Sequence, residues 1–278
     1  MKAQIDVRKM LQSKMGDKAN RIPAFLVNYL IRLVHQDELN DILNRYGEAD
    51  GVEFMRLLVT DYFKVELNII GEENIPTDDG KRYIFASNHP LGGFDGICLS
   101  YLLGSRYGGK IKCPVNDLLT YIPNLRSIFV PVNKHGKQNR ATAAETDDAY
   151  ASDNQILTFP AGLCSRKRHG VIRDLEWHKS FISKAIQHSR DVVPVYFEGR
   201  NSNFFYRLAN IRRFFNIKFN LEMLFLPDEL FKSKDKKFTV VVGQPIDYQI
   251  FKDGSKPTFH ASKVMETVYN LVTTASFR

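Results

Sequence analysis

From residue 64 onward, short apolar runs alternate with segments of helical period, and this alternation most strongly limits what the chain can fold into. The expected strands cover residues 65–70, 82–87, 111–115, 128–132, 156–159, 192–197 and 238–242, and the expected helices cover 96–103, 142–151, 177–188 and 261–273. Strands joined through helices pair in parallel, because each helix carries the chain back along the sheet. The pattern therefore predicts an α/β domain over residues 64–278, with a mostly parallel central sheet flanked by helices.

The first 63 residues have helical rather than strand periodicity. Amphipathic patterns cover residues 36–46 and 52–63, and an apolar stretch covers residues 22–34. That stretch contains Asn28 and Arg32 and is shorter than the roughly 20 apolar residues of a membrane-spanning helix. We therefore expect an N-terminal helical element over residues 1–63 that can lie on a membrane but does not cross it.

The overall charge points to an anionic partner. The 278 residues include 39 Lys and Arg against 31 Asp and Glu, a net charge of +8. Hydrophobic residues make up 44% and charged residues 25%, which excludes a mostly disordered or collagen-like chain. The excess of basic residues fits nucleic acid, an anionic lipid surface or an acidic substrate. The three cysteines show neither zinc-site spacing nor a disulfide framework, which favours a reducing, cytoplasmic setting.

One turn carries a pattern typical of catalysis. His89 follows the expected strand 82–87, and the residues after it are Pro-Leu-Gly-Gly-Phe, then Asp95 at the start of the expected helix. Ligands of α/β proteins bind at the carboxyl ends of strands. A glycine-rich turn can fold Asp95 back onto the imidazole, which leaves the other ring nitrogen free to act as a general base. The alternative left open by the spacing is that both residues only cap the helix.

Segments 71–76 and 83–90, followed by Asp95, resemble the first sequence block of the glycerolipid (lysophosphatidate-type) acyltransferase superfamily. The family's His and Asp are usually separated by four residues, whereas five separate them here. The resemblance implies direct acyl transfer from an acyl thioester, acyl-CoA or acyl-ACP, to a hydroxyl of a lipid precursor. His89 would be the general base oriented by Asp95, with no bound cofactor and no metal.

Three later segments resemble further blocks of that family in the family's order. Segment 127–132 resembles the second block, which normally ends in a substrate-binding Arg; Lys134 and Arg140 are the candidates here. Segment 193–195 resembles the fourth block, which is associated with the acyl donor. The third block, a Phe-Pro-Glu-Gly-Thr-Arg motif that binds the acceptor's phosphate, is matched at three positions and changed at three. The matching residues are Phe159, Pro160 and Gly162, and the changed ones are Ala161, Leu163 and Cys164.

These changes predict an altered acceptor site. Arg166 and Lys167 follow shortly after and can supply positive charge to a phosphate or carboxylate, although a solvated basic loop is the alternative. The changes resemble a hemolysin-like bacterial branch, some of whose members acylate the hydroxyl of an N-(3-hydroxyacyl) amino acid to make ornithine- or glycine-type lipids. We therefore expect the acceptor to be either lysophosphatidate-like or an N-acyl amino acid.

The positive charge is concentrated in two segments. Residues 1–34 hold seven basic and two acidic residues, and residues 204–219 hold four basic residues, no acidic ones and several aromatics. This composition is typical of a segment that lies in a membrane interface. The predicted docking residues are Phe204, Phe205, Arg207, Arg212, Arg213, Phe214 and Phe215. The alternative for this segment is that its aromatics pack in the core and its charges are solvated.

Taken together, the motifs favour a peripheral enzyme on the cytoplasmic side of the inner membrane. Its expected partners are membrane lipids, acyl-CoA or acyl carrier protein, and a lipid acceptor. Nucleic acid is the weakest candidate, because the sequence lacks nucleic-acid-binding signatures and the His–Asp turn would then have no use. The alternative left open is a basic membrane- or nucleic-acid-binding protein without catalysis.

Overall fold

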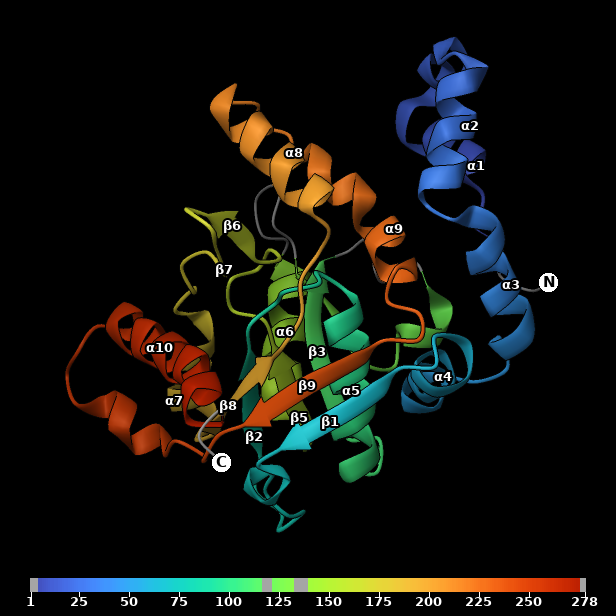
Figure 1. Cartoon of the computed structure of the whole chain (residues 1–278). Coiled ribbons are helices and arrows are strands. Elements are labelled where there is room, and N and C mark those ends of the chain that lie inside the picture. The colour runs from blue at the N-terminus through green and yellow to red at the C-terminus, as the bar shows by residue number, and fades with distance from the viewer. Residues whose placement is uncertain (1–4, 117–121, 133–139, 276–278) are drawn as a thin grey trace.

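The computed structural model describes residues 5–116, 122–132 and 140–275, and within them the central sheet has seven strands (Figure 1). Every expected strand is present, with each end within one residue of the prediction. The strands are β1 (Glu66–Ile70), β2 (Tyr83–Ser87), β3 (Ile111–Asn116), β4 (Phe129–Val132), β5 (Gln155–Thr158), β8 (Asp191–Phe197) and β9 (Lys237–Val242). The predicted α/β class is confirmed.

The strand order is β1-β9-β8-β2-β5-β3-β4. Strands β8, β2, β5, β3 and β4 pair in parallel, whereas β9 pairs antiparallel to β8 and parallel to β1. The five parallel strands therefore end at one edge of the sheet. The segments that follow β2, β5 and β8 are neighbours there, because these three strands are adjacent. The predicted mostly parallel sheet is confirmed, with an opposed pair at one side.

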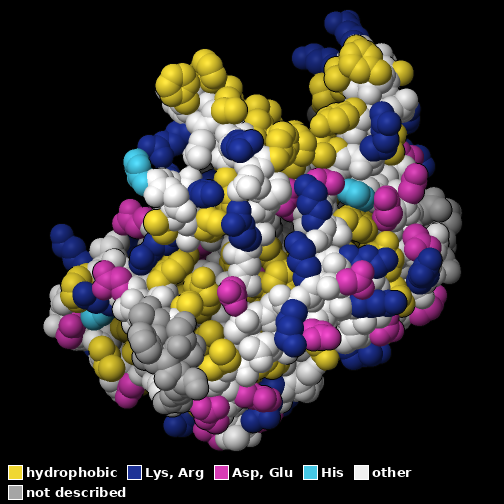
Figure 2. All heavy atoms as spheres, viewed as in Figure 1, with side chains coloured by type: hydrophobic (Ala, Val, Ile, Leu, Met, Phe, Trp, Pro, Cys, Tyr) yellow, Lys and Arg dark blue, Asp and Glu magenta, His cyan; other side chains and the backbone are white. Residues whose placement is uncertain are grey.

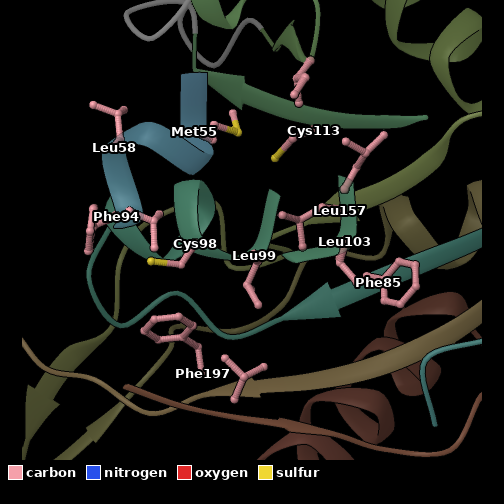
Figure 3. Packing of buried hydrophobic residues seen from close by; sticks show 14 of the residues in the cluster. Met55, Leu58, Phe85, Phe94, Cys98, Leu99, Leu103, Cys113, Leu157 and Phe197 are labelled. Carbon is pink, nitrogen blue, oxygen red and sulfur yellow. The ribbon is translucent and has the colours of Figure 1, made fainter. Parts of the chain in front are cut away.

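Helices cover both faces of the sheet, as predicted. The strand β2 shows why, because its five residues are all buried and point alternately to two apolar clusters. Tyr83 and Phe85 face the cluster that packs α5 (Phe94–Arg106) against the sheet, shown in part in Figure 3. Ile84 and Ala86 face the opposite cluster. The helices on that side are α6 (Arg140–Ala151), α7 (Ser180–His188) and α10 (Pro257–Ala275).

The N-terminal residues are helical, as predicted, and form an arm beside the sheet domain (Figure 1). The helices are α1 (Val7–Met15), α2 (Ala24–Leu33), α3 (Gln36–Tyr46) and α4 (Gly51–Leu57), followed by a π-helical turn (Leu58–Tyr62). Met55 and Leu58 belong to the same apolar cluster as α5 (Figure 3). Thus α4 packs into the main core, while α1 and α2 extend away from it. The division of the chain at residue 63 stays a prediction.

Two elements above the edge of the sheet are absent from the prediction. The basic residues for which a solvated loop was the alternative form an antiparallel hairpin of β6 (Arg166–Arg168) and β7 (Val171–Arg173). Residues 204–219 belong largely to α8 (Asn203–Phe214), which extends as a second arm and is followed by α9 (Leu226–Phe231) (Figure 1). The hairpin was missed because three successive basic residues resemble a solvated loop.

A buried charge network holds α8 against the hairpin. Glu222, in a 3₁₀ turn (Leu221–Phe225), is fully buried and accepts hydrogen bonds from two guanidinium groups. Arg166 Nη2 lies 3.0 Å from Glu222 Oε1, and Arg212 Nε lies 2.8 Å from Oε2. Arg166 also donates to the carbonyl of Cys164 at 2.7 Å. The single negative charge of Glu222 is therefore shared by two guanidinium groups inside the protein.

Candidate active site

The turn after β2 brings His89 and Asp95 together, as the sequence pattern predicts. Nδ1 of His89 lies 3.0 Å from Oδ2 of Asp95. Because an ionised carboxylate can only accept, Nδ1 carries the proton and Nε2 keeps its lone pair. Within the described part of the chain, Nε2 makes no hydrogen bond, and the His89 side chain is 16% exposed. The free nitrogen can therefore accept a proton from a bound molecule.

Asp95 is fully buried, and its carboxylate organises the whole turn. Besides His89, Oδ2 accepts the backbone N–H of Leu91 at 3.0 Å. Oδ1 accepts the N–H groups of Gly93 at 3.1 Å and Gly96 at 2.9 Å. Asp95 therefore both shapes the loop at the start of α5 and orients the imidazole. The N-cap residue of α5 is Gly93, so His89 and Asp95 do not act only as helix caps, and their catalytic role stays a prediction.

The extra residue in this turn is accommodated by Gly92. Its φ of +76° lies in the left-handed region that glycine adopts without steric cost. A β-carbon at this position would also lie 2.8 Å from Cβ of Cys164. The turn after β2 is thus packed directly against the segment that follows β5, with no room for a side chain between them.

The environment of Asp95 favours its charged form. Burial by itself would raise the pKa of Asp95. The attraction of His89 and the hydrogen bonds from His89, Leu91 and Gly96 outweigh burial, so the pKa of this carboxyl lies below its usual range. The carboxylate is therefore ionised at neutral pH and can stabilise a proton gained by His89.

The segment after β5 forms the other wall of the site. The ring of Phe159 stacks on the His89 imidazole, with the centroids 4.2 Å apart and the planes inclined by 29°. Pro160 is buried, and Gly162 has a φ of +66° and donates its N–H to the Phe159 carbonyl at 2.9 Å. These three residues match the family motif, and their structural effect is to hold an aromatic ring against the imidazole.

A second buried carboxylate, Asp174, supports the backbone of the turn. Oδ1 of Asp174 accepts the His89 N–H at 3.2 Å and the Ser165 hydroxyl at 2.5 Å, and Oδ2 accepts the Trp177 indole N–H at 3.0 Å. Ser165 in turn donates its N–H to the His89 carbonyl at 2.8 Å. Burial raises the pKa of Asp174, and its hydrogen bonds offset only part of that effect. Sequence reasoning missed Asp174, because 85 positions separate it from His89.

The four basic residues predicted to contact substrate differ in their surroundings and in whether the structure describes them. Arg166 is bound to Glu222 and is buried, so its guanidinium is turned into the protein rather than standing free for an acceptor. Lys167 is half-buried and lines a cavity beside α8. Arg140 begins α6, with its side chain outside what the structure describes, and Lys134 lies outside the described residues altogether.

The predicted docking segment divides into exposed and buried residues. Phe204, Phe214 and Phe215 are exposed, Phe214 to 82%. Arg207 and Arg213 are exposed as well. The prediction is wrong for Phe205, which is fully buried in a cluster with Tyr206 and Cys164. Arg212 is also unsuited to the predicted contact with lipid, because its guanidinium is hydrogen-bonded to Glu222.

Two general features of the described residues bear on the chemistry. In residues 5–116, 122–132 and 140–275, no helix has the length and apolar character needed to span a bilayer, and no cluster of metal-ligating side chains is found. Cys164, in the altered third block, is buried, and burial raises the pKa of its thiol to about 11 despite the opposing effect of Arg166. This thiol is therefore protonated at neutral pH.

The structure thus places an oriented imidazole at the carboxyl edge of the α/β sheet, with the third-block phenylalanine stacked on it. The chain belongs to the acyltransferase family, whose model matches residues 9–264. The expected family and the expected acyltransferase activity are confirmed.

Relatives cover nearly the whole chain. A lyso-glycine lipid O-acyltransferase of Bacteroides thetaiotaomicron is 48% identical over 267 residues, covering 96% of this chain and 97% of the relative. A protein of the same name from Phocaeicola vulgatus is 46% identical, covering 96% and 95%. The crystal structure of the 1-acyl-sn-glycerophosphate (LPA) acyltransferase PlsC from Thermotoga maritima is similar with a TM-score of 0.47 and 14% identity, covering 96% of each chain.

Proposed function

We propose that this chain transfers a fatty acyl group from an acyl thioester to the hydroxyl of a lyso-glycine lipid, with His89 as the general base. The observation that carries this proposal is the bond between His89 Nδ1 and the buried carboxylate of Asp95, which leaves Nε2 free to accept a proton. The two relatives named lyso-glycine lipid O-acyltransferases support the choice of acceptor.

The reaction balances with these two side chains alone. Nε2 of His89 takes the proton of the acceptor hydroxyl while the hydroxyl oxygen attacks the thioester carbonyl. The tetrahedral intermediate then collapses, the carbon–sulfur bond breaks, and the thiolate leaves with the proton from Nε2. Asp95 keeps the ring in the required tautomer and stabilises the imidazolium formed between these steps. General base catalysis of this kind contributes about 10²–10⁴-fold in rate.

A carboxylate-bearing acceptor also accounts for the changes in the third block. The family's phosphate-binding Glu and Arg positions are occupied by Ala161 and Cys164, both of which are buried. An N-acyl glycine presents a carboxylate with two oxygens in place of a phosphate and needs fewer donors. Lys134 and Arg140 stay the predicted replacements for the substrate-binding Arg of the second block. Acyl-CoA and acyl-ACP both fit the proposed reaction as acyl donors, because each presents the same kind of thioester.

We further propose that the enzyme docks peripherally on the cytoplasmic side of the inner membrane. Exposed apolar side chains gather at the ends of both arms, where Figure 2 shows them with basic residues nearby. They are Met10, Met15, Phe25, Leu26 and Tyr29 on the N-terminal arm, and Ile211, Phe214, Phe215, Ile217 and Phe219 at the end of the α8 arm. Apolar anchors combined with Lys and Arg favour an anionic lipid surface. The three free, buried cysteines are in keeping with a reducing compartment.

The proposed activity is tested with purified protein, a labelled acyl thioester and two acceptors at equal concentration, an N-(3-hydroxyacyl) glycine and lysophosphatidate. We expect the glycine acceptor to be acylated in preference. His89→Ala should abolish transfer while its circular dichroism spectrum stays that of the native chain. The matched control is His178→Ala, because His178 is exposed. Preference for lysophosphatidate would remove the proposed acceptor, and near-normal turnover by His89→Ala would remove the proposed base.

A further inference from the structure

A cavity of about 310 Å³ lies between the β6–β7 hairpin and α8. The hairpin contributes Lys167 and His169 at its turn end, and α8 contributes Asn203, Tyr206, Arg207 and Asn210. The four helix positions follow a spacing of three or four residues, so they share one face of α8. Polar and basic side chains therefore line a space formed by two separate elements.

The charge lining this cavity is not neutralised by the protein. No acidic side chain lines the cavity, and within the described residues Lys167, His169 and Arg207 make no ion pair. The nearby basic residues Arg166 and Arg212 differ in this respect, because both are bound to Glu222. Among the described residues, the buried guanidinium groups therefore have a counter-ion, whereas the basic groups that line the cavity have none.

The backbone of the hairpin places His169 at this cavity by an unusual turn. His169 and Gly170 connect the paired residues Arg168 and Val171, and both have positive φ values, +48° and +83°. A two-residue hairpin turn of this type normally has Asn, Asp or Gly at its first position. Strained backbone positions of this kind cluster at ligand sites.

Hydrogen-bond donors are available around the cavity. Asn203 Oδ1 accepts from Arg200 Nη2 at 2.7 Å, so its Nδ2 remains available as a donor. Lys167 and Arg207 add up to three and five N–H donors. The site therefore offers positive charge together with several donors, which matches a tetrahedral oxyanion better than a two-oxygen carboxylate.

The wall of the cavity is connected to the His89 turn through buried side chains. Tyr206, in its wall, packs in the same cluster as Cys164. Cys164 lies directly against Gly92, within the turn that holds His89. The wall of the cavity and the turn that holds His89 therefore belong to one packed unit.

We propose that this cavity is a binding site for a phosphate ester. Two molecules of the proposed reaction carry that group: the phosphopantetheine arm common to acyl-CoA and acyl-ACP, and the headgroup of an anionic phospholipid at the docking surface. Naming these sources rests on the proposed function. The chemistry of the site is the same for both, and the phosphate would be held by Lys167 and Arg207.

Calorimetric titration of the full chain tests this site without relying on activity. The probes are 4′-phosphopantetheine and deacylated phosphatidylglycerol, with pantetheine and glycerol as their phosphate-free counterparts, and N-acetylglycine as a carboxylate. We expect at least one phosphate probe to bind and its phosphate-free counterpart not to bind. Lys167→Ala and Arg207→Ala should each weaken binding by about tenfold, the usual effect of losing a charge-assisted hydrogen bond. Arg168→Ala is the matched control, because adjacent strand residues point to opposite faces.

The comparison of the two phosphate probes identifies the source, since the tighter one carries the group that the site recognises. The proposal is overturned if neither phosphate probe binds, if N-acetylglycine binds as tightly, or if Lys167→Ala and Arg207→Ala bind like Arg168→Ala. If the proposed phosphate site is overturned, acyl transfer to the glycine acceptor is still tested by its own assay. Binding with no transfer to that acceptor would instead refute the proposed function and leave the phosphate site in place.

Discussion

At the scale of single residues, the candidate site depends on one carboxylate with all of its acceptor capacity in use. Asp95 accepts three backbone N–H groups and one imidazole N–H, and it lies at the start of α5 without solvent contact. The same side chain therefore determines the shape of the turn and the tautomer of His89. Substitutions here affect fold and chemistry together, and measurements must separate the two.

Asp95→Asn should lower the transfer rate by about 10²–10⁴-fold. An asparagine NH₂ donates to Nδ1 of His89, which moves the imidazole proton to Nε2 and removes the base. Initial rates with the glycine acceptor measure the loss. Asp153→Asn is the control, because the Asp153 side chain is 96% exposed, and it should leave the rate unchanged. A rate for Asp95→Asn close to that of the native chain would contradict an orienting role.

The same variant should show a pH-dependent loss of stability. The pKa of Asp95 is lowered on folding, so its ionised form stabilises the native state above the usual aspartate pKa of about 3.9. That contribution is lost as the pH falls through the lower, folded-state pKa. The gap in unfolding midpoint between the native chain and Asp95→Asn should be constant near neutral pH and should narrow below about pH 3.9. A gap that does not change with pH would contradict this assignment.

Gly92 allows a second residue-scale prediction with an internal control. Gly92→Ala adds a β-carbon at a positive φ and places it 2.8 Å from Cβ of Cys164. Gly80→Ala meets the same backbone cost at a φ of +81° but has no atom within 4 Å. We expect Gly92→Ala to lower the free energy of unfolding by about 1–3 kcal/mol more than Gly80→Ala, the usual cost of overpacking. Equal effects in urea denaturation would show that the turn and Cys164 can separate.

At the scale of elements, the sequence correctly predicts the features that depend on residues close together in the chain. Strands such as β2 and β5 are fully buried and appear in the sequence as short apolar runs. The His89–Asp95 pair was found because six positions separate its members. The hairpin β6–β7 has no such signal, because the carboxylate that pairs with the buried Arg166, that of Glu222, is 56 positions away. Asp174 was missed for the same reason, since long-range partners leave no mark on local periodicity.

The buried network around Glu222 predicts how firmly the α8 arm is held. Glu222→Gln removes the one negative charge that Arg166 and Arg212 share and leaves both guanidinium groups without their counter-ion. Breaking a buried ion pair in this way costs about 3–5 kcal/mol. We expect a loss of this size in the free energy of unfolding, together with faster amide hydrogen exchange in α8. The exposed pair of Glu53 and Arg56 provides the control. If Glu222→Gln and Glu53→Gln lower the free energy of unfolding equally, Glu222 does not hold the α8 arm in place.

At the scale of the whole molecule, two arms extend from one α/β body and carry exposed apolar ends (Figures 1 and 2). His35, between α2 and α3 of the N-terminal arm, contacts α9: its Nε2 lies 3.2 Å from Oδ1 of Asp228, and its ring stacks on Phe231. Because α9 follows the α8 arm in the chain, this contact connects the two arms. The positions of the two apolar ends are therefore coupled through α9. This arrangement supports docking through both arms together.

Vesicle co-sedimentation tests docking through the arms. Phe214→Ser combined with Phe215→Ser should weaken binding to phosphatidylglycerol-containing vesicles by at least about tenfold, since burying one phenylalanine contributes about 1.5–3 kcal/mol. Added salt should weaken binding further, because the basic side chains are exposed. Phe259→Ser is the control, because Phe259 is 51% exposed on α10.

Turnover on detergent-solubilised substrate should be unchanged in the double variant, because the substitutions lie outside the site. Vesicle binding equal to that of Phe259→Ser would contradict docking through α8. A salt-dependent shift of an oligonucleotide without vesicle binding would favour the nucleic-acid alternative.

The position of β9 between β1 and β8 has a consequence for how the molecule is made. β1 is synthesised early, yet its only neighbour in the described sheet is near the end of the chain, and the bond from Asn74 Nδ2 to the Val242 carbonyl spans 168 positions. On the ribosome, β1 and β8 thus present open strand edges until β9 has emerged, and open edges promote association between chains. A chain that ends before residue 237 would keep both strand edges unpaired, and we expect it to aggregate.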